Sequence, residues 1–170
     1  LVLPDTITAG AQFGASIAVL DGATDYLVVG APTDTTDNTS GNGVAYVYSS
    51  ADGATWTLDA TLLPRLANVN NNFGYSVAIG ATQPPAIVIG APGYDTALET
   101  GDVDAPYAQI VNAGAGFCFT KQGADWKVRE GADTGDLWSP SIATANTSIG
   151  RAVAIAPTDP DHSLVGGETP

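Results

Sequence analysis

Hydrophobic positions in this chain fall in short runs that are separated by turn-forming residues. The segments 26–29 and 86–89, Tyr-Leu-Val-Val and Ala-Ile-Val-Ile, are the length of a β-strand and rich in β-branched side chains. No stretch keeps an i, i+3, i+4, i+7 apolar spacing over the length of a helix. The 20 glycines and 11 prolines supply many turns between the runs. The pattern predicts an all-β protein.

The runs recur in one register. The motif Phe-Gly and the strand after it occupy 13–19 and return at 73–79, an offset of 73 − 13 = 60 residues. Gly-Ala-Pro at 30–32 returns at 90–92 with the same offset. A third, degenerate copy begins at Ile149-Gly150. An internal repeat of this length is typical of architectures in which one small sheet is stacked on the next.

Each unit is predicted to form a four-stranded antiparallel sheet. In the first unit the strands A to D are expected at 16–20, 26–29, 44–49 and 55–62. Four short strands per repeat favour the blade of a β-propeller over a sandwich. We therefore divide the chain into four parts: the end of a preceding blade at 1–12, a blade at 13–72, a blade with an insertion at 73–148, and the start of a degenerate third blade at 149–170. Seven blades would need about 420 residues, so these two complete blades and their partial neighbours are expected to belong to a larger propeller, completed by the same chain or by another.

The motifs identify a family by resemblance. Phe13-Gly14 followed by Gly30-Ala31-Pro32, and again Phe73-Gly74 followed by Gly90-Ala91-Pro92, resemble the FG-GAP repeat of integrin α subunits. The segment from Gly43 to Tyr48 is similar to the strand that follows in that family. The resemblance implies an extracellular or cell-surface β-propeller for protein recognition or adhesion, within a larger surface or secreted protein. The alternative is a structural repeat unit of an extracellular filament or coat.

The negative net charge of the chain limits the classes of molecule that it is expected to bind. Five Lys and Arg residues stand against 18 Asp and Glu residues, a formal net charge of −13. Such a surface repels phosphate, which argues against nucleic acids and anionic membranes. No apolar run approaches the roughly 18 residues of a membrane span, so no membrane insertion is expected in this segment. A protein ligand, a neighbouring subunit or a cation is the expected partner.

Calcium is the only cofactor that the sequence suggests. The resemblance implies an Asp-rich loop between strands A and B, because oxygen ligands at alternate positions suit this cation. Asp21 and Asp25 match the end of that loop in the first unit, and Asp159 and Asp161 lie at the corresponding place in the third. The earlier carboxylates of the family loop are missing. We therefore expect weak calcium binding at most, and ordinary Asp/Gly turns are the alternative.

The connections between strands B and C and between strands D and A are longer than the other turns. Long loops on one rim of a rigid scaffold are where recognition usually lies. Two Asn-x-Ser/Thr sequons fall in these connections, at Asn38 and Asn146, and are candidates for glycosylation. The candidate partner-binding residues are the acids of the B–C connections: Asp34, Asp37, Asp95, Glu99, Asp102 and Asp104.

Catalysis has no support in the sequence, and we expect no enzyme activity from these residues. His162 is the only histidine and is expected in a turn after Asp161. Cys118 is the only cysteine and lies in an apolar run, so a buried, unreactive thiol is expected. Trp56 and Trp126 occupy matched positions in the two units, which favours a packing role.

Overall fold

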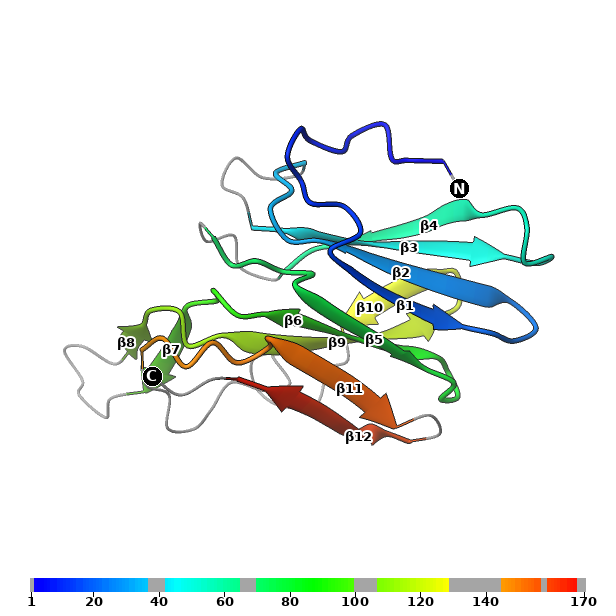
Figure 1. Cartoon of the computed structure of the whole chain (residues 1–170). Helices are drawn as coiled ribbons and strands as arrows, with labels where there is room; N and C mark the ends of the chain where they lie inside the picture. Colours follow the sequence, from blue (N-terminus) through cyan, green and yellow to red (C-terminus); the bar gives the residue numbers. More distant parts are fainter. Residues whose placement is uncertain are drawn as a thin grey trace.

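In the part of the chain that the structure describes, the all-β fold predicted from the hydrophobic pattern is confirmed. The computed structural model describes residues 2–36, 42–64, 70–99, 107–128, 145–156 and 159–167, and only the backbone of 97–99, 107–109 and 159–165. Every regular element in these ranges is a strand (Figure 1). The described residues include no helix that is long and apolar enough to cross a membrane.

The first sheet has the strand order β1-β2-β3-β4, and all neighbours are antiparallel. Its strands are β1 (Ser16–Leu20), β2 (Asp25–Ala31), β3 (Val44–Ser50) and β4 (Thr57–Leu62). The four strands predicted from the sequence are confirmed to within two residues at each end.

The second sheet repeats the first, in the order β5-β6-β9-β10. Its strands are β5 (Ser76–Gly80), β6 (Ala86–Ala91), β9 (Ala115–Gln122) and β10 (Asp125–Val128). Ser76 pairs with Gly90 as Ser16 pairs with Gly30. Residues 60 positions apart in the sequence therefore occupy equivalent positions in the two sheets.

Two further pairs of strands complete the described structure. The connection from β6 to β9, expected as one long loop, contains a small antiparallel pair, β7 (Thr96–Glu99) and β8 (Tyr107–Ile110). The third sheet pairs β11 (Ala152–Ala156) with β12 (Asp159–Gly166). The expectation of a turn at His162 is wrong, because β12 begins at Asp159 and its backbone pairs with β11 beyond that point.

Left-handed backbone conformations recur in the turns that lead into β1, β5 and β11. Each turn has a positive φ at three alternate positions, and the third is always a glycine. Because this region is costly for most side chains, the other two positions hold glycine or a small set of polar residues. The three sets are Gly10, Gln12 and Gly14; Asn70, Asn72 and Gly74; and Asn146, Ser148 and Gly150.

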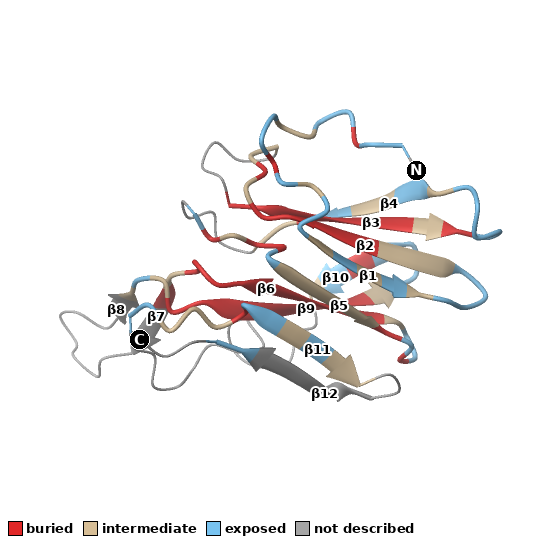
Figure 2. Ribbon diagram, viewed as in Figure 1, coloured by how far each residue is buried: buried red, intermediate tan, exposed pale blue. Residues whose placement is uncertain are grey.

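The sheets stack so that both faces of the second sheet are covered. Val28 and Val47 of the first sheet share a buried cluster with Ile87 and Ile89 of the second sheet. The opposite face of the second sheet packs Val88 and Cys118 against the third sheet, where Val153 and Ile155 lie. Figure 2 shows that the inner strands β3, β6 and β9 are mostly buried. Cys118 is fully buried, as expected.

An ion pair and an aromatic contact join the first two sheets, each between an inner strand of one sheet and an outer strand of the other. Trp126 is 8% exposed, and its ring meets that of Tyr26 edge-on at 5.4 Å between centroids. The Trp126 Nε1–H and the Lys121 ammonium both donate to Oδ2 of Asp59, at 2.7 and 2.6 Å. The packing role expected for this tryptophan is confirmed.

A serine hydroxyl joins each sheet to the next. Ser16 of β1 donates to the carbonyl oxygen of Gly74 at 2.8 Å, and Ser76 of β5 donates to that of Gly150 at 2.8 Å. A backbone amide adds a second bond at each junction. The Phe73 N–H donates to the Asn42 carbonyl at 2.8 Å, and the Ile149 N–H donates to that of Ala113 at 3.0 Å.

Glycines in β2 and β6 allow the sheets to approach this closely. A Cβ on Gly30 would collide with the Gly74 carbonyl, and one on Gly90 would collide with that of Gly150. The glycine of the Gly-Ala-Pro motif is therefore required by the backbone of the following sheet. We call the serine hydroxyl, the backbone amide and the glycine together the sheet junction.

Candidate functional site

The connections that leave β2 and β6 lie at one end of the stack, together with the turns that enter β1, β5 and β11 (left in Figure 1). The tight turns from β1 to β2 and from β5 to β6 lie at the other end. This arrangement follows from the antiparallel strand order, because alternate connections fall on opposite edges. We call the first end the loop rim.

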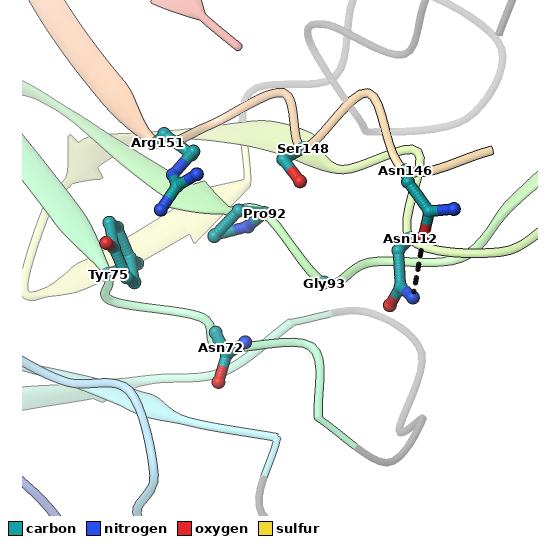
Figure 3. A pocket seen from close by; sticks show the side chains of 8 residues that line it. All are labelled: Asn72, Tyr75, Pro92, Gly93, Asn112, Asn146, Ser148 and Arg151. Carbon is teal, nitrogen blue, oxygen red and sulfur yellow. Dashed lines mark hydrogen bonds between the residues drawn. The ribbon is translucent and has the colours of Figure 1, made fainter. Parts of the chain in front are cut away.

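A pocket opens on the loop rim between the second and third sheets (Figure 3). Its volume is about 270 Å³, enough for one or two side chains of a partner. The polar residues are contributed by three segments: the turn into β5, the end of the β6–β9 connection and the turn into β11. The lining consists of Asn72, Tyr75, Pro92, Gly93, Asn112, Asn146, Ser148 and Arg151.

Left-handed backbone positions the polar side chains of this pocket. Asn72, Asn112, Asn146 and Ser148 have φ angles of 53°, 50°, 65° and 52°. Asparagine tolerates this region better than most residues, because its short amide bonds to nearby backbone. The three amide side chains and the hydroxyl that line the pocket therefore come from backbone positions outside the conformational range of a β-strand.

Hydrogen bonds hold the two sides of the pocket together. The Ser148 N–H donates to the Asn112 carbonyl at 3.2 Å, and the Asn146 N–H donates to the Val111 carbonyl at 3.1 Å. The side chains of Asn112 and Asn146 also meet, with Nδ2 and Oδ1 at 3.4 Å (Figure 3). The segment before β11 is thus fixed to the segment before β9.

The described lining of the pocket contains one charged side chain, the cation Arg151. The Arg151 guanidinium lies 5.8 Å from the centroid of the Tyr75 ring, within range of a cation–π contact. The lining residues that the structure describes include no carboxylate. Tyr75 is 41% exposed, so its ring also offers apolar contact area. The pocket suits a polar or negatively charged group beside a flat surface.

Among the acids predicted to bind a partner, Asp34 does not face solvent. This residue is fully buried. It accepts hydrogen bonds from Tyr46 Oη at 2.7 Å, Thr36 Oγ1 at 2.6 Å and Thr8 Oγ1 at 2.8 Å. Burial alone would raise its pKa, but these hydrogen bonds outweigh burial and place the pKa below the ordinary value of 3.8. Asp34 therefore has a bracing role: its hydrogen bonds hold the connection after β2 against β3 and against the segment before β1.

The other predicted partner-binding acids are only partly described. Asp95 is half-buried, and its Oδ1 accepts a hydrogen bond from the Asn112 N–H at 2.8 Å, next to the pocket. Glu99 lies in β7, where the backbone alone is described. Asp37, Asp102 and Asp104 lie outside the described residues.

The residues suggested for calcium do not form a cluster in the described part of the chain. Asp25 lies at the start of β2, and its Oδ1 accepts the Gly22 N–H at 3.0 Å, which closes the turn. Asp21 is exposed in the same turn. Asp159 and Asp161 belong to β12, where side chains are not described. No group of three His, Cys, Asp or Glu side chains occurs within the described ranges. Two carboxylates alone do not fit a site of six to eight oxygens, and weak binding at most stays a prediction.

Of the two sequons, the one at Asn146 lies in the described part of the chain. Asn146 is exposed, in the turn before β11, and it lines the pocket. Asn38 lies outside the described residues. Glycosylation of Asn146 stays a prediction.

Sequence reasoning missed Tyr75, Asn72, Asn112 and Arg151. A signal for part of this set was present in the aligned units. Gly10 of the first unit is replaced by Asn70 and Asn146 in the next two, and asparagine is one of the few residues besides glycine that tolerate a left-handed backbone. Comparison with protein-family models and a search of curated proteins find no match to this chain.

Proposed function

We propose that this chain is a run of FG-GAP β-propeller blades in an extracellular or cell-surface protein, and that it recognises a protein partner on the loop rim. The first and second sheets are complete blades in this proposal, and the third sheet begins another.

The way the sheets pack supports the propeller. In a sandwich each sheet has one inner face, and the other face meets water. Here the second sheet buries one face against the first sheet and the other against the third. Its buried residues form the near-continuous apolar strands that two covered faces require: β6 is buried at all six positions. The same sheet junction at both interfaces supports one repeated stacking operation.

The observation that carries recognition is the pocket between the second and third sheets. It lies on the loop rim, and it concentrates amides, a hydroxyl, an aromatic ring and a cation within one surface. Arg and Tyr are enriched among residues that dominate protein interfaces. A partner that inserts an acidic side chain into the pocket would meet the positive charge of Arg151, whereas the net charge of −13 repels acidic groups elsewhere on the chain.

Partner capture by two rim variants tests this proposal. The chain is immobilised, and secreted and surface proteins of its source organism are captured and identified by cross-linking. We expect Arg151→Ala and Tyr75→Ala each to weaken capture of one defined partner by about tenfold, the usual scale for such interface residues. Asp21→Asn and Asp125→Asn are the matched controls, because both residues are exposed on the opposite end. Loss of capture in the controls but not in the rim variants would overturn the proposal.

A further inference from the structure

The polar groups that line the pocket on the loop rim both donate and accept hydrogen bonds. Asn72, Asn112 and Asn146 each carry an amide nitrogen and an amide oxygen, and Ser148 carries a hydroxyl. Among the described residues, these three amides make one side-chain hydrogen bond, from Asn112 Nδ2 to Asn146 Oδ1. A bare carboxylate only accepts hydrogen bonds, so it offers the amide oxygens no donor. The lining therefore fits a ligand that carries hydroxyl groups.

An exposed ring and a guanidinium lie beside these amides. Tyr75 is 41% exposed, and the Arg151 guanidinium lies 5.8 Å from the centroid of its ring. Figure 3 shows this pair at one side of the opening, with Asn112 and Asn146 at the other. The ring offers a flat apolar surface, and the guanidinium has several N–H donors, so it can hold a carboxylate besides its other contacts. The lining as a whole fits a ligand that combines an apolar face, hydroxyls and a carboxylate.

The pair of Tyr75 and Arg151 is particular to one junction of the stack. Alignment of the three units places Ala15, Tyr75 and Arg151 at the same position, directly after the glycine of the Phe-Gly or Ile-Gly motif. The equivalent pair at the junction of the first and second sheets is therefore Ala15 and Tyr75, and neither is a cation. Gly93 also replaces Thr33 of the first unit, whose side chain bonds to the turn before β1. The repeat does not require this lining, which favours a role in binding.

The size of the pocket restricts the ligand to a single ring. Its volume of about 270 Å³ lies just under the roughly 300 Å³ at which pockets for drug-sized ligands begin. Hydrogen bonds to the backbone hold one wall in place: the Ser148 N–H donates to the Asn112 carbonyl, and the Asn112 N–H donates to Asp95 Oδ1. A wall that is formed in advance loses less conformational entropy when a ligand binds.

We propose that this pocket binds one hexuronic acid unit, a pyranose sugar that carries a carboxylate. The carboxylate pairs with Arg151, the C–H face of the ring stacks on Tyr75, and the hydroxyls bond to the amides. The inference rests on the proposal that the loop rim recognises a partner, and it names the group of the partner that enters the pocket. That group is an acidic sugar of a glycan on the partner, not an amino-acid side chain.

Titration with two simple sugars tests the inference. The probes are methyl β-D-glucuronide and methyl β-D-glucoside, which share the ring and differ in a carboxylate against a hydroxymethyl group. Binding is followed by the NMR chemical shifts of the protein. We expect a dissociation constant of about 1 mM for the glucuronide, the scale that the usual ligand efficiency gives for a molecule of this size. The constant for the glucoside should be about tenfold higher or more, because it lacks the charge-assisted pair.

Two variants separate the contributions of the cation and the ring. Arg151→Gln should weaken glucuronide binding to the level of the glucoside and leave the glucoside nearly unchanged. Tyr75→Ala should weaken both sugars by about fivefold, because both stack the same ring face. Lys127→Gln is the matched control. It also removes one positive charge from an exposed position, but on β10, and it should leave both constants unchanged.

Equal affinity of the parent chain for the two sugars would overturn the inference, and this comparison needs no variant. Unchanged glucuronide binding by Arg151→Gln would overturn it as well. A third probe, N-acetylglutamate N-methylamide, represents an acidic side chain. If it binds as tightly as the glucuronide and Arg151→Gln abolishes its binding, the inference is wrong while the proposed recognition of a protein stands. Glucuronide binding as expected, without capture of any partner by the rim, would leave the inference standing and overturn the proposed function.

Discussion

The carboxylate of Asp34 joins three segments that are distant in sequence. It accepts hydrogen bonds from Thr8 before β1, from Thr36 after β2 and from Tyr46 in β3. A buried carboxylate is costly unless its oxygens are satisfied, and here hydroxyl donors reach both of them. The loop conformation and the packing of the segment before β1 therefore depend on one residue.

Asp34→Asn should lower the free energy of unfolding by about 2 kcal/mol at pH 7, since hydrogen bonds to a charged acceptor are replaced by an amide that accepts at one atom only. The pKa of Asp34 is lower in the folded protein than its ordinary 3.8, so its stabilising contribution is complete above that value. The contribution is lost as the pH falls through the folded pKa, and the difference between the two proteins should shrink below about pH 4.

Guanidinium unfolding at pH 7 and pH 3 measures both effects. Asp125→Asn is the control, because Asp125 is exposed and its replacement should change stability by less than about 0.5 kcal/mol. If Asp34→Asn were as stable as this control at pH 7, the bracing role would be wrong.

For single residues, the sequence predicted the place in the chain more readily than the structural role of the side chain. Asp34 was correctly placed in the connection after strand B, but its burial depends on Tyr46 and Thr8, which the linear sequence does not bring together. Arg151 was a single cation in a degenerate motif. Its position over Tyr75 follows from the stacking of two sheets, and no local pattern predicts that.

At the scale of elements, the repeat made the strands predictable. Residues 16–20 were predicted correctly because their apolar alternation recurs 60 residues later in the same order. The pair β7 and β8 was missed because it lies in the insertion of the second unit. Comparison of the repeated units predicts only the strands that they share. The start of β12 at Asp159 was missed because Asp-Pro-Asp is typical of turns, whereas pairing with β11 decided the conformation.

The sheet junction makes a prediction at this scale. Gly90→Ala should lower the free energy of unfolding by about 3 kcal/mol or more, because the new Cβ meets the main-chain carbonyl of Gly150, which cannot move without shifting the third sheet. Gly166 is the equivalent glycine in the third sheet, and among the described residues a Cβ there would meet only atoms of Ala152, at 3.8 Å.

Gly166→Ala should therefore be tolerated, with a change of less than about 1 kcal/mol in either direction. Thermal or guanidinium unfolding of the two variants decides between a steric requirement and a general strand effect. Equal destabilisation of Gly90→Ala and Gly166→Ala would show that the close approach of the next sheet is not what the glycine serves.

At the scale of the whole molecule, the two complete sheets and the third one form a stack with unlike ends. One end presents Ile17 and Val19 to solvent. At the other end, Ala152 stands in β11 at the place of Ser16 and Ser76, so the third sheet lacks the hydroxyl that would extend the series. The sequence predicted the repeated unit, but the direction of stacking required the structure, because it depends on which face of each strand meets the next sheet.

The central claim is that these sheets are successive propeller blades, and the crystal structure of the chain tests it most directly. The quantities to measure are the rotation that carries the first sheet onto the second, and the rotation that carries β5 and β6 onto β11 and β12. Four to eight blades divide a full circle into steps of roughly 45° to 90°. We predict that both rotations fall in this range, have the same sense and share one axis. Two rotations about different axes, or sheets related by the roughly 30° twist of a sandwich, would contradict the claim.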